Sequence, residues 1–243
     1  MKAILQDIVS HTHNLGFLEI VKITGDEKTV KINSMADDRT VIMSAETAGP
    51  YPDIQGIFGM PQLNKLKIHL DCPEYKEDAK IQVVTTERNG EDVPDHLHFE
   101  NASGDFENNY RFMSREVITE KLKKVNFKGA TWAIDFEPSV TSIQRLRLQA
   151  AAHSEESCFQ VRTENDNLVF FFGDASTHSG SFTFHSPAGG KLKQAWAWPV
   201  TQVMSILALG GDKTIKISDG GAMQITVNSG LAEYNYILPA QTK

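Results

Sequence analysis

The strongest constraint on the fold is an alternation of apolar and polar side chains with a period of two, which recurs along most of the chain. This alternation predicts strands with one face buried and the other in water. Short turns rich in Gly, Asn and Asp separate neighbouring runs, so we expect antiparallel sheets. The runs are FLEIVKI (17–23), TVKINSM (29–35), TVIMSA (40–45), LKIHL (66–70), IQVVTT (81–86), FQVRT (159–163), LVFFF (168–172), GSFTFHS (180–186), KTIKIS (213–218), AMQITV (222–227) and AEYNYIL (232–238).

Four segments break this alternation and predict helices. The first covers about residues 3–14 and has an apolar side. The second begins at Asp53, a good N-cap, and is ended by Pro61. The third follows Pro138-Ser139, and the fourth begins at Trp198-Pro199 and closes at Gly210-Gly211. The apolar stripes of these helices are Ile4, Leu5 and Ile8; Ile54, Ile57 and Phe58; Ile143, Leu146 and Ala150; and Val200, Val203, Met204 and Leu207.

The order of these elements indicates a structural duplication. Helix, strands, helix, strands occurs twice, without obvious sequence identity between the halves. We therefore predict an α+β protein of two similar domains, each with two helices on antiparallel sheet. The boundaries are 1–113 for the first domain, 114–130 for a Lys-rich connector and 131–243 for the second domain.

Charge and composition narrow the class of protein. The net charge is −7, which counts against a nucleic-acid binder unless the basic residues gather on one surface. Two separated cysteines fit a reducing cytoplasm, and the N-terminus, MKAILQDIVSHTH, does not read as a signal peptide. No apolar stretch reaches the length of a membrane span, so we expect a cytoplasmic protein with no membrane partner.

The sequence contains no strong catalytic or metal motif. His11-x-His13 and His96-x-His98 each lack a third ligand at a usual spacing. GGDKT (210–214) follows a helix instead of preceding one, which favours a helix cap over a phosphate loop. A Gly-x-Ser-x-Gly elbow is also missing from the sequence. We therefore predict a protein that is not an enzyme and has no cofactor.

Three stretches resemble the DNA polymerase sliding clamps, the processivity factors of replication, and in particular those of tailed phages. DIQGIFGM (53–60) is similar to their second-helix segment, and TWAI (131–134) before a helix is similar to the opening of their second domain. YILPA (236–240) resembles their C-terminus. These clamps are related in fold to the eukaryotic and archaeal proliferating-cell-antigen clamps.

The resemblance implies a viral DNA replication protein that encloses duplex DNA without sequence preference. Six such domains close a clamp ring, so a two-domain chain would form a homotrimer with sheets outside and helices lining the hole. DNA polymerase and a clamp loader would be its partners, in a bacterial host's cytoplasm if the chain is phage-encoded. The side chains that would face DNA are Lys2, His13, Lys65, Arg145, Gln149 and Gln202. The pocket for a partner peptide would contain Val125, Phe127, Ile237, Leu238 and Pro239.

Two interpretations other than a clamp stay open from the residues. Arg147 falls nearer the apolar side of the third helix, which favours a structural role, and each cation above has a solvated surface charge as its alternative. A β-rich phage structural or assembly protein would share the strand content and the lack of catalytic motifs. The second alternative is an enzyme whose active site is assembled from residues that are distant in the sequence.

Overall fold

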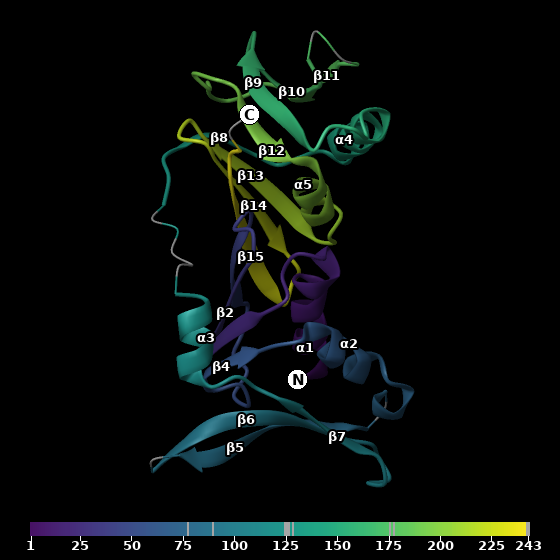
Figure 1. Cartoon of the computed structure of the whole chain (residues 1–243), viewed down its shortest axis with the longest axis vertical. Coiled ribbons are helices and arrows are strands. Elements are labelled where there is room, and N and C mark those ends of the chain that lie inside the picture. Colours follow the sequence, from purple (N-terminus) through teal and green to yellow (C-terminus); the bar gives the residue numbers. More distant parts are fainter. Residues whose placement is uncertain are drawn as a thin grey trace. The chain divides into compact units, whose positions relative to one another are not determined.

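The computed structural model of the chain describes residues 1–76, 78–88, 90–123, 127, 129–174, 176 and 178–241 (Figure 1). The chain divides into two compact units. The first contains Met1–Asn126 together with Ser229–Tyr234, and the second contains Phe127–Asn228 together with Asn235–Lys243. A short segment from near the C-terminus therefore completes the N-terminal unit.

The first unit is built from two antiparallel sheets and three α-helices. One sheet has the strand order β4-β1-β2-β3, and the other has the order β5-β6-β7. Its elements are α1 (Lys2–Ser10), a 3-10 turn (His13–Leu15), β1 (Val21–Gly25), β2 (Val30–Met35), β3 (Ile42–Thr47), β4 (Gly56–Met60), α2 (Leu63–Asp71), a second 3-10 turn (Pro73–Tyr75), β5 (Lys80–Arg88), β6 (Glu91–Glu100), β7 (Glu107–Arg111) and α3 (Arg115–Lys121).

The second unit has two sheets with the orders β11-β10-β9-β12 and β15-β14-β13-β8. β15 begins with residues that count in the first unit. The elements are β8 (Trp132–Phe136), α4 (Val140–Ala152), β9 (Cys158–Glu164), β10 (Asn167–Phe172), β11 (Gly180–His185), β12 (Trp196–Pro199), α5 (Val200–Leu207), β13 (Asp212–Ser218), β14 (Ala222–Asn228) and β15 (Ala232–Pro239).

The second unit repeats the order strand, helix, three strands: first β8 to β11, then β12 to β15. The strand that begins each repeat pairs with a strand of the other repeat: β8 pairs with β13, and β12 pairs with β9. The first unit follows the same scheme, because β4, which begins its second repeat, pairs with β1 of its first repeat. Its first repeat begins with α1, since no strand precedes α1 among the described residues. The prediction of an α+β chain with two similar domains is confirmed.

Each unit has its own core between helices and sheets. In the first unit, α1 buries Ile4, Leu5, Ile8 and Val9, and it packs beside α2. In the second, the rings of Phe170 and Phe184 stack with centroids 4.2 Å apart. Trp198 is fully buried, and its indole Nε1–H donates to the carbonyl of Leu238 at 3.1 Å. Burial of these large side chains is the main stabilising contribution in both units.

The predicted helix at Asp53 is wrong, because residues 56–60 form strand β4. GIFGM pairs with β1 residue for residue, from Gly25 opposite Gly56 to Val21 opposite Met60. Phe58 and Met60 face the core at the strand spacing, whereas two glycines weaken a helix here. DIQGIFGM therefore does not form a helix, and its resemblance to the second-helix segment of phage clamps no longer supports a phage type.

The predicted strand LKIHL is also wrong, because it lies inside helix α2. Leu63, Leu66 and Leu70 are the buried residues of α2, at spacings of three and four that only a helix places on one side. In a segment of only five residues, the apolar positions expected for a strand and for a helix overlap so much that the sequence pattern cannot distinguish the two. Helix α3, capped by Ser114 and within the expected connector, is not predicted by the sequence pattern; nor are strands β6, β7, β8 and β12.

Candidate nucleic-acid interface

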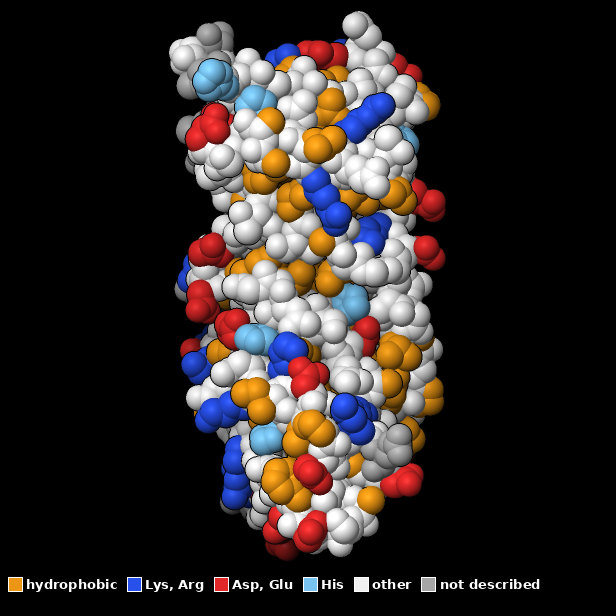
Figure 2. Space-filling view, turned by 90° about the vertical axis from the view of Figure 1, so that its right-hand side faces the viewer, with side chains coloured by type: hydrophobic (Ala, Val, Ile, Leu, Met, Phe, Trp, Pro, Cys, Tyr) orange, Lys and Arg blue, Asp and Glu red, His pale blue; other side chains and the backbone are white. Residues whose placement is uncertain are grey.

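In each unit, two helices lie next to each other and leave one side open to solvent. α1 packs beside α2 in the first unit, and α4 packs beside α5 in the second (Figure 1). Sheets cover the opposite side of each pair, so the exposed side chains of the four helices form one surface per unit. Figure 2 faces the helices and shows Lys and Arg side chains among apolar ones. This is the surface on which the predicted DNA-facing residues must be judged.

The four helices are basic although the chain is acidic. Their Lys and Arg side chains outnumber their carboxylates by five to two, while the whole chain has a net charge of −7. The cations are Lys2, Lys65, Lys67, Arg145 and Arg147, and the carboxylates are Asp7 and Asp71. The excess negative charge of the chain therefore lies outside these helices, which is the distribution expected of a phosphate-facing surface.

Both carboxylates on the helices are held by neighbouring donors. Lys67 Nζ donates to Asp71 Oδ2 at 2.6 Å, one helical turn away. Asp7 Oδ2 accepts hydrogen bonds of 2.8 Å from both the Ser229 and Tyr234 hydroxyls, and Oδ1 lies 3.3 Å from His11 Nδ1. Burial raises the pKa of Asp7, but the hydrogen bonds outweigh burial and the net pKa lies below its ordinary value.

The same four-residue pattern occurs on α2 and on α4. Lys65-Leu66-Lys67-Ile68 and Arg145-Leu146-Arg147-Leu148 each place a cation, a leucine, a second cation and an aliphatic residue in succession. Leu66 and Leu146 are fully buried and fix each helix against its own unit. We call these two segments the basic tetrads. The residues next to a buried leucine lie on the flanks of its helix, where Lys65, Arg145 and Arg147 are exposed and Lys67 is half-buried.

The last residue of each basic tetrad is an aliphatic side chain in solvent. Ile68 is 66% exposed and Leu148 is 71% exposed. They are among the most exposed large apolar side chains of the described residues, and both lie between or beside cations.

The structure places the six predicted DNA-facing residues in different settings. Lys65 and Arg145 are exposed in the basic tetrads. Lys2 donates to the backbone carbonyl of Tyr75, and His13 Nδ1 lies 3.2 Å from Glu19 Oε2, so both are held by their own unit. Gln149 packs against Gly180, and Gln202 is half-buried on α5.

Sequence reasoning missed two cations of this surface. Arg147 was expected on the apolar side, but it is exposed, because Leu146 and Ser142 define the buried side of α4. Lys67 is not among the expected DNA-facing residues, because LKIHL has the alternation of a strand, although it lies in helix α2. The signal that finds both is the recurrence of the tetrad pattern in the two halves of the chain.

The five predicted pocket residues do not form one exposed patch. Ile237 and Leu238 are 7% and 0% exposed and belong to the core of the second unit. Phe127 is partly exposed, with its ring 6.1 Å from that of Trp132, and Pro239 is exposed. Val125 lies outside the described residues. Phe127 and Pro239 therefore remain as the side chains that a partner could reach.

Among the described residues, no group of three His, Cys, Asp or Glu side chains is placed to hold a metal ion. None of the helices in the described ranges is long and apolar enough to cross a membrane.

No family model and no curated protein matches the sequence. Solved structures do match. The structure of A. fulgidus PCNA bound to the C-terminal region of FEN-1 has a TM-score of 0.68 and 12% identity, covering 100% of this chain and 95% of that chain. PCNA from Thermococcus kodakaraensis has a TM-score of 0.66 and 11% identity, covering 99% and 97%. At such identities the likeness concerns the fold, so the chain has the fold of the PCNA sliding clamps.

Proposed function

We propose that this chain is a non-catalytic sliding clamp, which encircles duplex DNA and tethers a DNA polymerase during replication. The observation that carries the proposal is the segregation of charge: four helices with a positive balance in an acidic chain that has the clamp fold. A ring holds DNA by topology, so it does not need base contacts. A tethered polymerase then keeps a high effective concentration at the template.

The basic tetrads are the proposed DNA-facing elements. Lys65, Arg145 and Arg147 are exposed, and Lys67 shares its charge with Asp71. A small number of cations per chain gives weak, salt-dependent attraction to phosphates, which suits a ring that must slide. Ile68 and Leu148 add surface that cannot bind phosphate and so limits the grip on DNA.

A homotrimeric ring is supported by the edges of the two units. In the first unit, the N–H of Ala48, just after β3, donates to the carbonyl of Leu231, just before β15, at 2.8 Å. In the repeat scheme, β11 is the counterpart of β3 and β7 is the counterpart of β15. β7 and β11 each end their own sheet. We propose that β11 of one copy pairs with β7 of the next, which closes a ring and removes both free edges.

The proposed partners are a DNA polymerase and a clamp loader. A. fulgidus PCNA has been solved with a segment of FEN-1 bound to it. By analogy, we propose that short segments of partner proteins bind this chain beside Phe127 and Pro239, with Ile237 and Leu238 as the buried floor. The proposal of a phage source, and so of a location in the cytoplasm of a bacterial host, is supported only by the resemblance of TWAI (131–134) and YILPA (236–240) to phage clamps.

An order-of-addition experiment tests encirclement without a loader. A linear duplex carries biotin at both ends, and the full chain is added either before or after streptavidin blocks those ends. A ring that threads over open ends is trapped only when it is added first, and it then stays bound in high salt. Equal retention for the two orders of addition, or dissociation in both, would contradict the proposal.

A further inference from the structure

The sheet β5-β6-β7 of the first unit has an edge that its counterpart in the second unit lacks. In the second unit, β13 is covered on its outer side by β8, with Ile215 opposite Phe136 and Ile217 opposite Ile134. In the first unit, β5 pairs with β6 alone among the described residues. The backbone of β5 makes no further hydrogen bond to the described backbone on its outer side.

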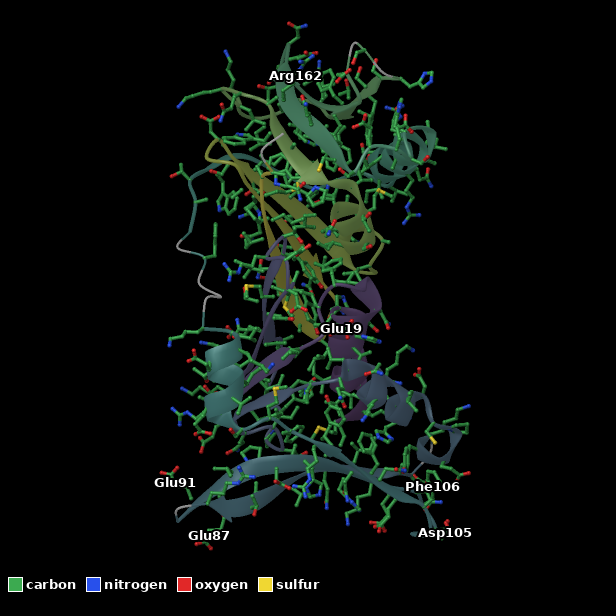
Figure 3. The ribbon with its side chains drawn as sticks, viewed as in Figure 1. Glu19, Glu87, Glu91, Asp105, Phe106 and Arg162 are labelled. Carbon is green, nitrogen blue, oxygen red and sulfur yellow. The ribbon has the colours of Figure 1, made fainter. Side chains whose placement is uncertain are left out.

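The middle of β5 has the composition of a strand that accepts another strand. Ile81–Thr86 reads IQVVTT, six residues rich in β-branched side chains and without a charge or a proline. Charged residues stand at the ends, at Lys80, Glu87 and Arg88; Figure 3 labels Glu87 near the hairpin. The pairing of β5 with β6 is irregular between Val84 and Thr85, but residues 81–86 lack the charges and prolines by which natural edge strands usually prevent pairing with other chains.

An apolar void too small to admit a side chain lies behind β5. It is lined by Met1, Leu5, Phe58, Val83, Leu97 and Phe112. Val83 and Ile81 point inward from β5, opposite Leu97 and Phe99 of β6, yet both are only partly buried. In the second unit, by contrast, β8 adds the buried side chains of Ile134 and Phe136 to the core. The first unit therefore has a free edge whose inward side chains, Ile81 and Val83, are only partly covered.

We propose that the edge of β5 binds an extended apolar segment of a partner protein as an added antiparallel strand. β8 defines the chemistry of that segment: Trp132-Ala133-Ile134-Asp135-Phe136 alternates large apolar residues with small or acidic ones. The large residues would cover the partly exposed Ile81 and Val83 while the backbone completes the sheet, which is the mode of recognition known as β-augmentation.

Charge favours an acidic residue on the outward side of the added strand. In the second unit, the outward Asp135 lies 3.2 Å from Lys216 Nζ on β13. On β5, Lys80 is on the outward side, where its Nζ lies 3.6 Å from Glu100 Oε2; its side chain is more than half exposed, so it can also reach a carboxylate on an added strand. The β5 edge is separate from β7 and β11, so this site does not depend on the proposed ring.

The test uses the full chain and a peptide with the sequence ATWAIDFEP, residues 130–138, as the probe. Hydrogen exchange is followed for the amides of β5 as the peptide is added. We expect at least tenfold slower exchange within residues 81–86 and no change in β7 or β11. A control peptide with aspartate at the position of Ile134 should protect nothing. Exchange of β5 that is unaffected by the first peptide would overturn the proposal.

Two matched variants keep the result interpretable. Val83→Asp places a charge on the inward side of β5 and should weaken peptide binding at least tenfold. Val140→Asp makes the same change at an exposed position on α4 and should leave binding unchanged. Binding that is the same in both variants would contradict the site. Protection of β5 that rises with protein concentration in the absence of peptide would instead identify a second copy of this chain as the occupant.

Discussion

The hydroxyl of Tyr234 donates a 2.8 Å hydrogen bond to Asp7 Oδ2, although the two residues are 227 positions apart in the sequence. His11 stacks on the same tyrosine ring, with centroids 4.1 Å apart. Helix α1 and the start of β15 are thus joined within the first unit by a charged hydrogen bond. The segment Ser229–Tyr234 completes that unit as a structural part of it.

Removing this hydroxyl should destabilise the first unit. A hydrogen bond to a charged group contributes about 1.5 to 3 kcal/mol, and here the acceptor is partly buried. We expect Tyr234→Phe to lower the free energy of unfolding by about 2 kcal/mol, measured by urea denaturation. Tyr51→Phe is the control, because Tyr51 makes no side-chain hydrogen bond among the described residues. Equal destabilisation of the two variants would contradict the assigned role.

The same carboxylate should make stability depend on acid pH. Burial alone would raise the pKa of Asp7, but donors from His11, Tyr234 and Ser229 hold it below its ordinary value of 3.8. A lowered pKa in the folded state contributes stability above the unfolded value, and this is lost as pH falls through the folded value. Wild type should therefore exceed Asp7→Asn in stability at neutral pH, and the difference should shrink below about pH 4. A difference that is constant down to about pH 2 would show that charge is not involved.

The packing of α3 on β4 depends on the absence of a side chain at Gly59. A Cβ placed there would lie 2.8 Å from Cβ and Cγ1 of the buried Ile118. Gly59→Ala should cost about 1 to 3 kcal/mol through overpacking. Combined with Ile118→Ala, the destabilisation should be smaller than the sum of the two single effects. Gly49→Ala, which meets nothing within 4 Å, is the matched control. Additive effects in thermal or urea unfolding would contradict this packing.

The basic tetrads should account for much of the attraction to DNA. Lys65→Glu combined with Arg145→Glu should weaken binding to a short duplex. It should also lower the slope of log affinity against log salt by about 0.9 for each phosphate that is no longer neutralised. Lys28→Glu with Lys191→Glu changes the net charge equally at exposed positions outside the four helices. Fluorescence anisotropy at several salt concentrations distinguishes the two pairs. The same effect from both would mean that net charge, and not the helical surface, attracts DNA.

Much of the fold could be predicted because local signals agree with tertiary packing. Ser139 caps α4 through a 3.0 Å bond from the Ser142 N–H, and Leu146 is buried as its spacing predicts. The strands 159–163 and 222–227 keep their alternation because one face of each is in the core. Where a segment is short, as at β4 and in LKIHL, the apolar positions fit both the strand period and the helix period. Tertiary packing alone then decides which of the two forms.

The site was less predictable, because its features depend on residues that are distant in sequence. Strand β6 contains Pro94 opposite an irregularity at Val84/Thr85, which hides its alternation. The bond between Asp7 and Tyr234 joins side chains 227 positions apart. The free edges of β5, β7 and β11 follow from the sheet order. Local sequence patterns predict neither. Lys65 and Arg145 could be named from the sequence, but their common tetrad pattern is meaningful only once α2 is known to be a helix.

The most direct test of a ring-forming clamp is the mass of the full chain in solution, measured by light scattering across a range of concentrations. The account predicts one species of three times the 27.0 kDa chain mass. It also predicts that Thr183→Pro, which interrupts the free edge of β11, shifts that species toward the mass of one chain. A single-chain mass at every concentration, or a mass that keeps growing with concentration, would contradict the account.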